Sequence, residues 1–166
     1  MLKETFYLPI KLRPVTISQG WHGPFSHYAG WVTIDLSHAV DFAVPWGTVV
    51  YAAAAGVVEP LDFWGEWYGG DEATIGAKAR SNLAIVRHGS GLISVYSHLE
   101  TGSVSQRWHR GERVGIGEEI GITGRSGWVP QHCPHLHFQV LQDLISVPYS
   151  FVDYSGPLED AEIRKR

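Results

Sequence analysis

The side chains best suited to chemistry are two histidines, His135 and His137, near the C-terminal end of the chain. They lie in the run His-Leu-His-Phe-Gln-Val at 135–140, which alternates as a strand does. Because the side chains of a strand alternate between its faces, both imidazoles are expected on one face, with Leu136 and Phe138 on the other. Two such imidazoles can bind one metal ion, or one can bind it while the other transfers protons. By itself, the spacing fits two ordinary half-exposed strand residues equally well.

Partners for this pair are available elsewhere in the chain, which contains nine histidines. A hydrolytic zinc site takes about three protein ligands and keeps one position open for water. The charge of the metal lowers the pKa of that water, so that it can react near neutral pH. Asp41, in the alternating run at 38–45, has the residue type of a ligand, although an isolated Asp is more often a solvated strand residue. The other histidines are His22, His27, His38, His88, His98, His109 and His132.

Short strands must position these side chains, because the chain shows little helical periodicity. Apolar residues alternate in short runs between turn residues, and the chain contains 19 glycines and nine prolines. This pattern predicts a mainly β fold, a single compact domain of antiparallel β-sheets with long groove-forming loops. One or two short strands are expected between Phe6 and Ile17, interrupted by Pro9 and Pro14. Further strands are expected over residues 38–45, 49–54, 56–60, 82–88, 92–99, 112–114, 119–123 and 135–140.

Composition and charge exclude several classes of protein. A length of 166 residues fits one domain with its own core. The net charge of −4 and the lack of a basic stripe argue against a nucleic-acid-binding protein. No run of about 18 apolar residues and no secretory signal peptide are visible, so no membrane span is predicted. Cys133 is the only cysteine, which excludes an intramolecular disulfide, and its place two residues before His135 makes a Cys–His nucleophile a minor alternative.

Several motifs follow one another in a particular order. Ala-Val-Asp-Phe at 39–42 comes first, then Asn82, Tyr-Ser-His-Leu at 96–99, a series of glycines between 111 and 127, and His-Leu-His-Phe at 135–138. Over residues 18–152 the chain resembles the lysostaphin-type (LytM-like) zinc metallopeptidases, a family of peptidoglycan endopeptidases. The resemblance implies one zinc ion (Zn2+) per chain, bound by a His, an Asp and the second His of the last motif. The last two of these ligands match Asp41 and His137.

The resemblance also implies two catalytic histidines that do not bind the metal. His135 matches the first His of the last motif, and His98 matches the His of the Tyr-x-His-Leu motif. In the family these side chains are thought to assist the attacking water and to stabilise the oxyanion. The two members of the His-x-His pair are therefore expected to have different tasks.

The first zinc ligand is indicated less directly. The commonest family pattern places it four residues before the Asp, where this chain has Ser37. His38 is three residues before Asp41, and strand residues at that spacing face opposite sides unless a bulge intervenes. A subset of the family instead has a Ser-His at the end of a Gln-Gly…Phe-Ser-His loop, which residues 19–27 match. His27 is therefore predicted as the ligand, with His38 and then His22 as the alternatives.

Three loops are expected to form a groove around the site, over residues 19–30, 62–80 and 124–134. A long loop in a compact domain is usually functional or disordered. Tryptophans of these loops are candidate walls for an extended ligand, although scattered tryptophans also serve as ordinary packing residues. The candidate wall residues are Trp21, Trp64, Trp67 and Trp128.

The function implied by the resemblance is zinc-dependent hydrolysis of the peptide part of bacterial peptidoglycan, in stem or cross-bridge peptides. Its implied place of action is outside the cytoplasm, in the periplasm or cell wall or as a secreted protein, and a monomer is expected. Residues 1–17 are expected to pack on a peptidase domain at 18–152, followed by a C-terminal tail at 153–166. Two other functions stay open: a non-catalytic LytM-like module that activates another cell-wall hydrolase, and a zinc peptidase with a non-wall peptide substrate.

Overall fold

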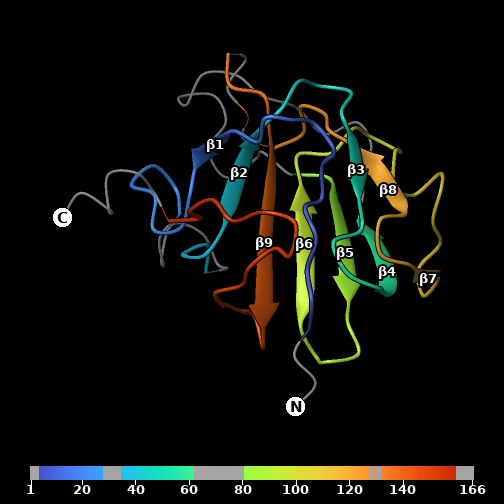
Figure 1. Cartoon of the computed structure of the whole chain (residues 1–166). Coiled ribbons are helices and arrows are strands. Elements are labelled where there is room, and N and C mark those ends of the chain that lie inside the picture. The colour runs from blue at the N-terminus through green and yellow to red at the C-terminus, as the bar shows by residue number, and fades with distance from the viewer. Residues whose placement is uncertain (1–3, 28–34, 62–80, 128, 130–131, 160–166) are drawn as a thin grey trace.

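The computed structural model describes residues 4–27, 35–61, 81–127, 129 and 132–159, in which ten strands and no helix are present. Eight strands form one antiparallel sheet in the order β1–β2–β9–β6–β5–β4–β7, with β10 paired to β9, while β3 and β8 pair with each other (Figure 1). No part of the described chain forms a helix long and apolar enough to span a membrane. The strands are β1 (Ile17–Gln19), β2 (Val40–Ala43), β3 (Val49–Tyr51), β4 (Gly56–Leu61), β5 (Leu83–Arg87), β6 (Ile93–Ser97), β7 (Arg113–Val114), β8 (Glu119–Ile122), β9 (His135–Gln142) and β10 (Ile145–Ser146).

Strand β9 lies between β2 and β6 in the interior of the large sheet (Figure 1). All of its residues except the last, Gln142, are buried. The register places Asp41 of β2 and Ser97 of β6 opposite His137, on either side of β9. Residues paired directly across antiparallel strands project from the same face, so these three side chains share one face of the sheet.

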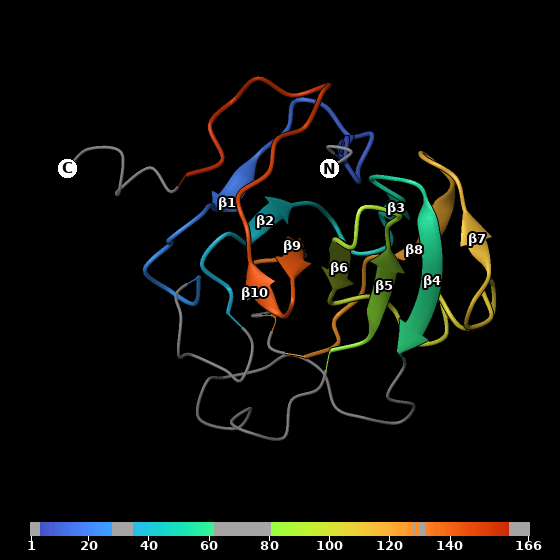
Figure 2. The same ribbon diagram turned by 90° about the horizontal axis from the view of Figure 1, so that it is seen from below.

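The opposite face of the sheet carries the hydrophobic core. Phe138 of β9, Tyr96 of β6 and Phe42 of β2 are completely buried there. Segments from both ends of the chain cover this face and lie above the sheet in Figure 2. Phe6 bridges Phe151, whose ring centroid is 5.6 Å from that of Phe138. The core also includes Leu8, Ile10, Val50, Ala52, Ala53, Ile120 and Tyr149.

The predicted fold class is confirmed, and each strand expected between residues 38 and 140 has a counterpart in the structure. The expectation for the N-terminal segment is only partly right. Phe6 makes an isolated bridge, and the first strand begins at Ile17. Pro9 and Pro14 have no amide hydrogen to donate to a ladder, which explains the lack of a strand between them. Strand β10 has only two residues, too few for alternation to be recognised.

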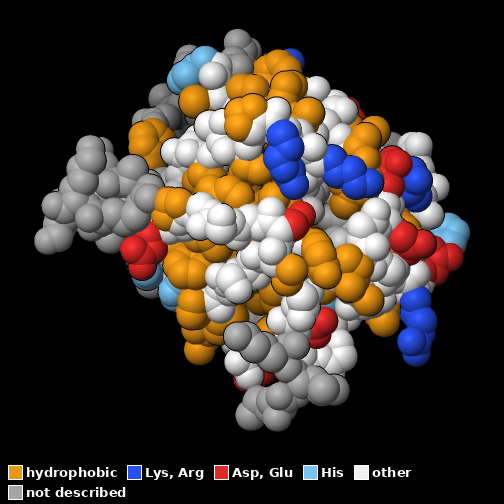
Figure 3. Space-filling model, viewed as in Figure 1, with side chains coloured by type: hydrophobic (Ala, Val, Ile, Leu, Met, Phe, Trp, Pro, Cys, Tyr) orange, Lys and Arg blue, Asp and Glu red, His pale blue; other side chains and the backbone are white. Residues whose placement is uncertain are grey.

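Charged side chains form ion pairs at β4 and β5 and at the start of β8. Glu59 lies 3.1 Å from Arg87 and 3.7 Å from Arg110. Arg107 lies 2.9 Å from Glu119. At the right-hand side of Figure 3, Lys and Arg side chains accordingly lie among Asp and Glu side chains. This part of the surface therefore presents no uniform positive charge.

Candidate metal and catalytic site

Three buried side chains from distant parts of the chain converge on the sheet face opposite the core: His27, Asp41 and His137. One ligand atom from each lies within 4.8 Å of the others. Nδ1 of His137 lies 2.9 Å from Oδ1 of Asp41, and Nε2 of His27 lies 3.3 Å from the same oxygen. Two imidazole nitrogens and one carboxylate oxygen form a donor set that suits a hydrolytic zinc ion.

Two different parts of the fold position these side chains. Asp41 and His137 come together because they are register partners in the β2–β9 pair. His27 comes from the loop after β1, where its backbone N–H donates to the Gly23 carbonyl at 3.1 Å and its Nδ1 donates to the Gly20 carbonyl at 2.9 Å. This leaves Nε2 of His27, a buried atom without a hydrogen-bond partner, directed toward the carboxylate. A buried lone pair in this position fits a bound cation.

Burial and mutual contacts set the protonation of the three side chains. Burial works to raise the pKa of Asp41, but His135, His27 and His137 outweigh it and hold that pKa well below its usual range. Burial works to lower the pKa of His27, but the Asp41 carboxylate and the backbone of Gly20 and Ala39 together outweigh burial and raise that pKa. Burial lowers the pKa of His137, and the opposing attraction of Asp41 does not cancel this effect. Asp41 is therefore a buried anion beside two imidazoles.

Two further histidines, His98 and His135, lie beside the cluster with their ring centroids 4.7 Å apart. Nε2 of His135 is 3.8 Å from Oδ1 of Asp41. Each ring donates its Nδ1–H to a backbone carbonyl at 2.8 Å, His135 to that of Cys133 and His98 to that of Ser126. A carbonyl oxygen only accepts, so in each neutral ring Nε2 carries the lone pair. Both side chains can therefore accept a hydrogen bond at Nε2.

The backbone of His98 adopts a left-handed conformation, with φ of 64°. Such a conformation in a residue other than glycine costs on the order of 1–3 kcal/mol and persists only where its surroundings hold it. Two hydrogen bonds hold it here, because the His98 N–H donates to Ser81 Oγ at 2.7 Å and its carbonyl accepts from the Gly124 N–H at 2.7 Å. Burial, then the neighbouring His135 and His137, lower the pKa of His98 to about 3. The ring is therefore neutral at ordinary pH.

His38, the alternative metal ligand, makes its contacts elsewhere. Its Nδ1 is 3.1 Å from the carbonyl of Ser146, and its ring centroid is 4.9 Å from that of His22. His38 lies in the turn before β2 and not in the strand itself, so strand alternation does not decide its direction. The structure thus brings His27, and not His38, to the carboxylate of Asp41.

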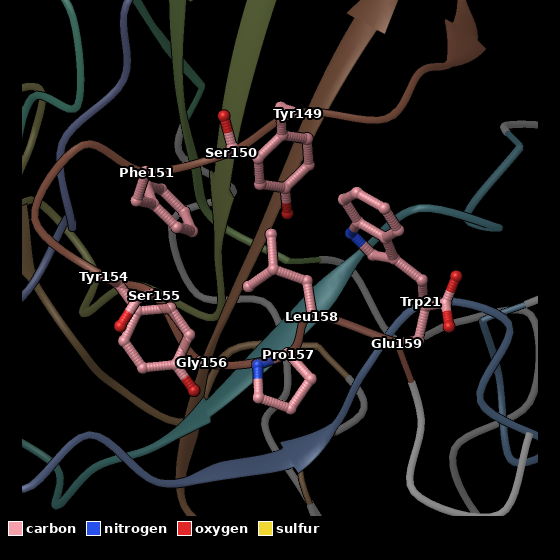
Figure 4. Close-up of a pocket in the computed structure, with 10 residues that line it drawn as sticks. All are labelled: Trp21, Tyr149, Ser150, Phe151, Tyr154, Ser155, Gly156, Pro157, Leu158 and Glu159. Atoms are coloured by element: carbon pink, nitrogen blue, oxygen red, sulfur yellow. The ribbon is translucent and has the colours of Figure 1, made fainter. Parts of the chain in front are cut away.

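Trp21, a candidate groove wall, is partly buried and packs against the hydrophobic core. Its ring centroid is 5.5 Å from that of Tyr149, which is 5.3 Å from that of Phe138. Its backbone N–H donates to the Leu158 carbonyl at 2.7 Å, which joins the loop to the C-terminal segment. Trp21 and Tyr149 border a pocket of about 440 Å³ (Figure 4). The pocket is lined by Trp21, Tyr149, Ser150, Phe151, Tyr154, Ser155, Gly156, Pro157, Leu158 and Glu159.

The remaining groove predictions fall largely outside the described residues. Trp64, Trp67 and Trp128 lie outside them, as does the whole loop at 62–80. The loops at 19–30 and 124–134 are described only in part. The predicted walls formed by these three tryptophans therefore stay a prediction.

Two supporting residues were not among the predicted site residues. Gln19 donates from Nε2 to Oδ2 of Asp41 at 3.1 Å. Ser81 accepts the N–H of His98, as described above. The only sequence signal for Gln19 is its place at the start of the Gln-Gly motif, and the only one for Ser81 is that it precedes Asn82.

Comparison with protein families gives a match over residues 35–147, more than half of the chain, to the model described as Peptidase family M23. Similar curated sequences include Peptidoglycan DD-endopeptidase ShyC of Vibrio cholerae, 32% identical over 108 residues, which are 65% of this chain and 21% of that protein. DD-carboxypeptidase/endopeptidase Mpg of Neisseria meningitidis serogroup B is 33% identical over 107 residues, which are 64% of this chain and 20% of that protein. The matched stretch spans about a fifth of the length of these relatives.

Solved structures share the architecture. A zinc-containing peptidase from Vibrio cholerae has a TM-score of 0.60 and 24% identity, covering 90% of this chain and 41% of that one. The solution structure of lysostaphin has a TM-score of 0.56 and 19% identity, covering 96% of this chain and 61% of that one. At these identities the likeness shows a common fold.

Proposed function

The chain belongs to peptidase family M23, and we propose that it is a zinc-dependent endopeptidase that hydrolyses peptide bonds in bacterial peptidoglycan. The observation that carries this proposal is the convergence of His27, Asp41 and His137 within 4.8 Å of one another. Two further histidines, His98 and His135, lie beside this cluster, and each directs Nδ1 to a backbone carbonyl so that Nε2 is left for other partners. A donor set for a metal and groups that handle protons are thus present in one place.

Zinc would be held by Nε2 of His27, Oδ1 of Asp41 and Nδ1 of His137. When bound, zinc supplies a Lewis acid for the scissile carbonyl and lowers the pKa of a water molecule so that it can attack. The chain supplies the rest of the chemistry. Asp41 provides the negative charge that makes the buried site favourable for a cation, and the Gly20 carbonyl keeps the His27 ring turned so that Nε2 faces the site.

His98 and His135 would handle the proton of the attacking water. Because Nδ1 of each ring donates to a carbonyl, Nε2 is the atom that accepts a hydrogen bond from the water and orients it. A ring that has taken up the proton at Nε2 can then donate it to the oxyanion or to the leaving amine. One well-placed donor of this kind is typically worth about 10²–10³ in rate.

The substrate class rests on the relatives. ShyC is named a peptidoglycan DD-endopeptidase, and Mpg a DD-carboxypeptidase/endopeptidase. We infer that this chain likewise acts on peptide stems or cross-bridges of the cell wall, outside the cytoplasm. A non-catalytic module that activates another hydrolase would have no need of all five side chains, so their joint presence favours an enzyme.

The test is digestion of purified peptidoglycan by the zinc-loaded protein, with and without a chelator, and identification of the new termini by mass spectrometry. New amino and carboxyl termini are expected only without chelator. Asp41→Asn, which removes the central charge of the cluster, should release nothing. Undigested peptidoglycan with the zinc-loaded wild-type protein would contradict the proposal. It would favour the alternative, a non-catalytic module that activates another hydrolase.

A further inference from the structure

Gln19, the last residue of β1, is the register partner of Asp41 across the β1–β2 pair. Its Nε2 donates to Oδ2 of Asp41 at 3.1 Å and to Oγ of Ser26 at 2.9 Å. Its Oε1 accepts the backbone N–H groups of Phe25 and Ser26 at 3.0 and 3.2 Å. Because a backbone N–H only donates, these two contacts determine which end of the carboxamide faces Asp41.

These four hydrogen bonds connect two of the predicted ligands. The contact with Oδ2 engages the outer oxygen of Asp41 and leaves Oδ1 for Nε2 of His27 and Nδ1 of His137. The contacts with Phe25 and Ser26 hold the turn that immediately precedes His27. One neutral side chain thus orients the carboxylate and also sets the position of the loop that delivers the imidazole.

Space for this arrangement depends on Gly23. A Cβ at that position would lie 2.3 Å from Cγ of Gln19 and 2.9 Å from its Cδ and Oε1. Any larger residue would therefore push the Gln19 side chain away, although the backbone of Gly23 requires no unusual φ. The glycine forms a cradle for the glutamine stem.

We infer that Gln19 is a positioning residue of the metal site, which orders Asp41 and His27 for the ion without binding it. This inference rests on the proposed function, because it assigns the residue a task toward zinc. Outer partners of metal ligands typically contribute 10–100-fold to metal affinity. The truncation Gln19→Ala removes all four hydrogen bonds while it leaves the three predicted ligands in place.

The first experiment measures zinc affinity by competition with a chromophoric chelator, and the visible spectrum of the cobalt-loaded protein. Gln19→Ala should lower zinc affinity about 10–100-fold and alter the cobalt spectrum, which reports ligand geometry. Gln106→Ala, at an exposed position, is the matched control and should change neither. Thermal unfolding in chelator accompanies both variants, because a purely structural task would lower the unfolding temperature and leave the cobalt spectrum unchanged.

The second experiment uses the cradle. Gly23→Ala displaces Gln19 without removing a polar atom, so it should also lower zinc affinity. In a Gln19→Ala background Cγ is gone, and Gly23→Ala should then cost nothing further, which a double-mutant cycle measures. Gly89→Ala, where an added Cβ meets nothing within 4 Å, is the control.

The outcomes separate this inference from the proposed function. The zinc affinity of the wild-type protein, and its visible spectrum without cobalt, are measured first. A wild-type protein that binds no zinc would overturn both proposals. Zinc binding within threefold of wild type in Gln19→Ala, with an unchanged cobalt spectrum, would overturn the task of Gln19 alone. Full additivity of Gly23→Ala and Gln19→Ala would overturn the cradle.

Discussion

His137 and Asp41 face each other across the β2–β9 pair, with Nδ1 of His137 2.9 Å from Oδ1 of Asp41. Two neighbouring interior strands of the sheet thus hold two of the three predicted ligands in a fixed register. The third, His27, depends on a loop that is held by Gly20 and Gly23. The metal site therefore has two parts. A strand pair fixes Asp41 and His137, while a few hydrogen bonds hold the loop that carries His27.

Removal of the loop ligand should abolish tight metal binding. His27→Ala takes away one of three donors and is expected to lower zinc affinity by more than roughly 100-fold, beyond the loss typical of an outer partner. His38→Ala should keep wild-type affinity, because its ring lies against His22 and the Ser146 carbonyl. Zinc content after gel filtration and chelator competition measure both. Loss of zinc in His38→Ala with retention in His27→Ala would reverse the assignment.

Strand periodicity predicts much of this site. Alternation along 135–140 places His135 and His137 on one face, and both are buried there near Asp41. This feature follows from local backbone geometry, so the sequence is sufficient for it. His38 lies in the turn before β2, so strand alternation does not govern its position relative to Asp41. The family predicted from the ordered motifs is likewise confirmed by the match over residues 35–147.

Loop side chains depend on contacts that no local pattern encodes. His27 was indicated only by the resemblance of its loop, and it reaches the cluster through hydrogen bonds to two glycine carbonyls. The packing of Trp21 on Tyr149 is one such contact, because the surface that a loop aromatic meets is set by the tertiary fold. The positive φ of His98 has no sequence signal either, since distant hydrogen-bond partners hold it.

Zinc affinity should fall at acid pH with a slope set by one proton. Burial works to lower the pKa of His27, but Asp41 and the backbone of Gly20 and Ala39 together outweigh it and raise that pKa above its usual value near 6.5. Asp41 stays ionised and the lowered pKa of His137 keeps that ring neutral, so His27 is the group that must release a proton to bind metal. Below the raised pKa, the dissociation constant is expected to increase about tenfold per pH unit. Chelator competition between pH 5.5 and 8.5 measures this slope.

The control for the pH series is His38→Ala, which should show the same slope as the wild-type protein. Calorimetry in buffers of different ionisation enthalpy should detect proton release on zinc binding near pH 6.5. An affinity that stays constant between pH 5.5 and 6.5 would contradict the raised pKa of His27.

A substitution on the core face of the sheet should lower stability without changing the metal site. Tyr96 is completely buried, and its hydroxyl accepts the Ala53 N–H at 2.8 Å and lies 3.1 Å from Oγ of Ser94. Tyr96→Phe leaves that buried N–H without its partner and is expected to lower the free energy of unfolding by about 1–3 kcal/mol. Zinc affinity should not change, because Tyr96 and His137 project from opposite faces. Denaturant unfolding, with exposed Tyr7→Phe as the control, measures the difference.

The strained backbone of His98 gives a further prediction that concerns catalysis. Ser81 Oγ accepts the His98 N–H at 2.7 Å and helps to hold φ at 64°. Ser81→Ala removes this acceptor, so the His98 ring is expected to leave its position. The kcat for peptidoglycan hydrolysis should then fall about tenfold, which is part of the 10²–10⁴ typical of a positioned proton-transfer group. Zinc affinity should stay at the wild-type level, since no predicted ligand contacts Ser81. The control Ser150→Ala, at an exposed position, should alter neither kcat nor zinc affinity. A wild-type kcat in Ser81→Ala would contradict the prediction and show that the contacts with Ser126 and Gly124 are enough to hold His98.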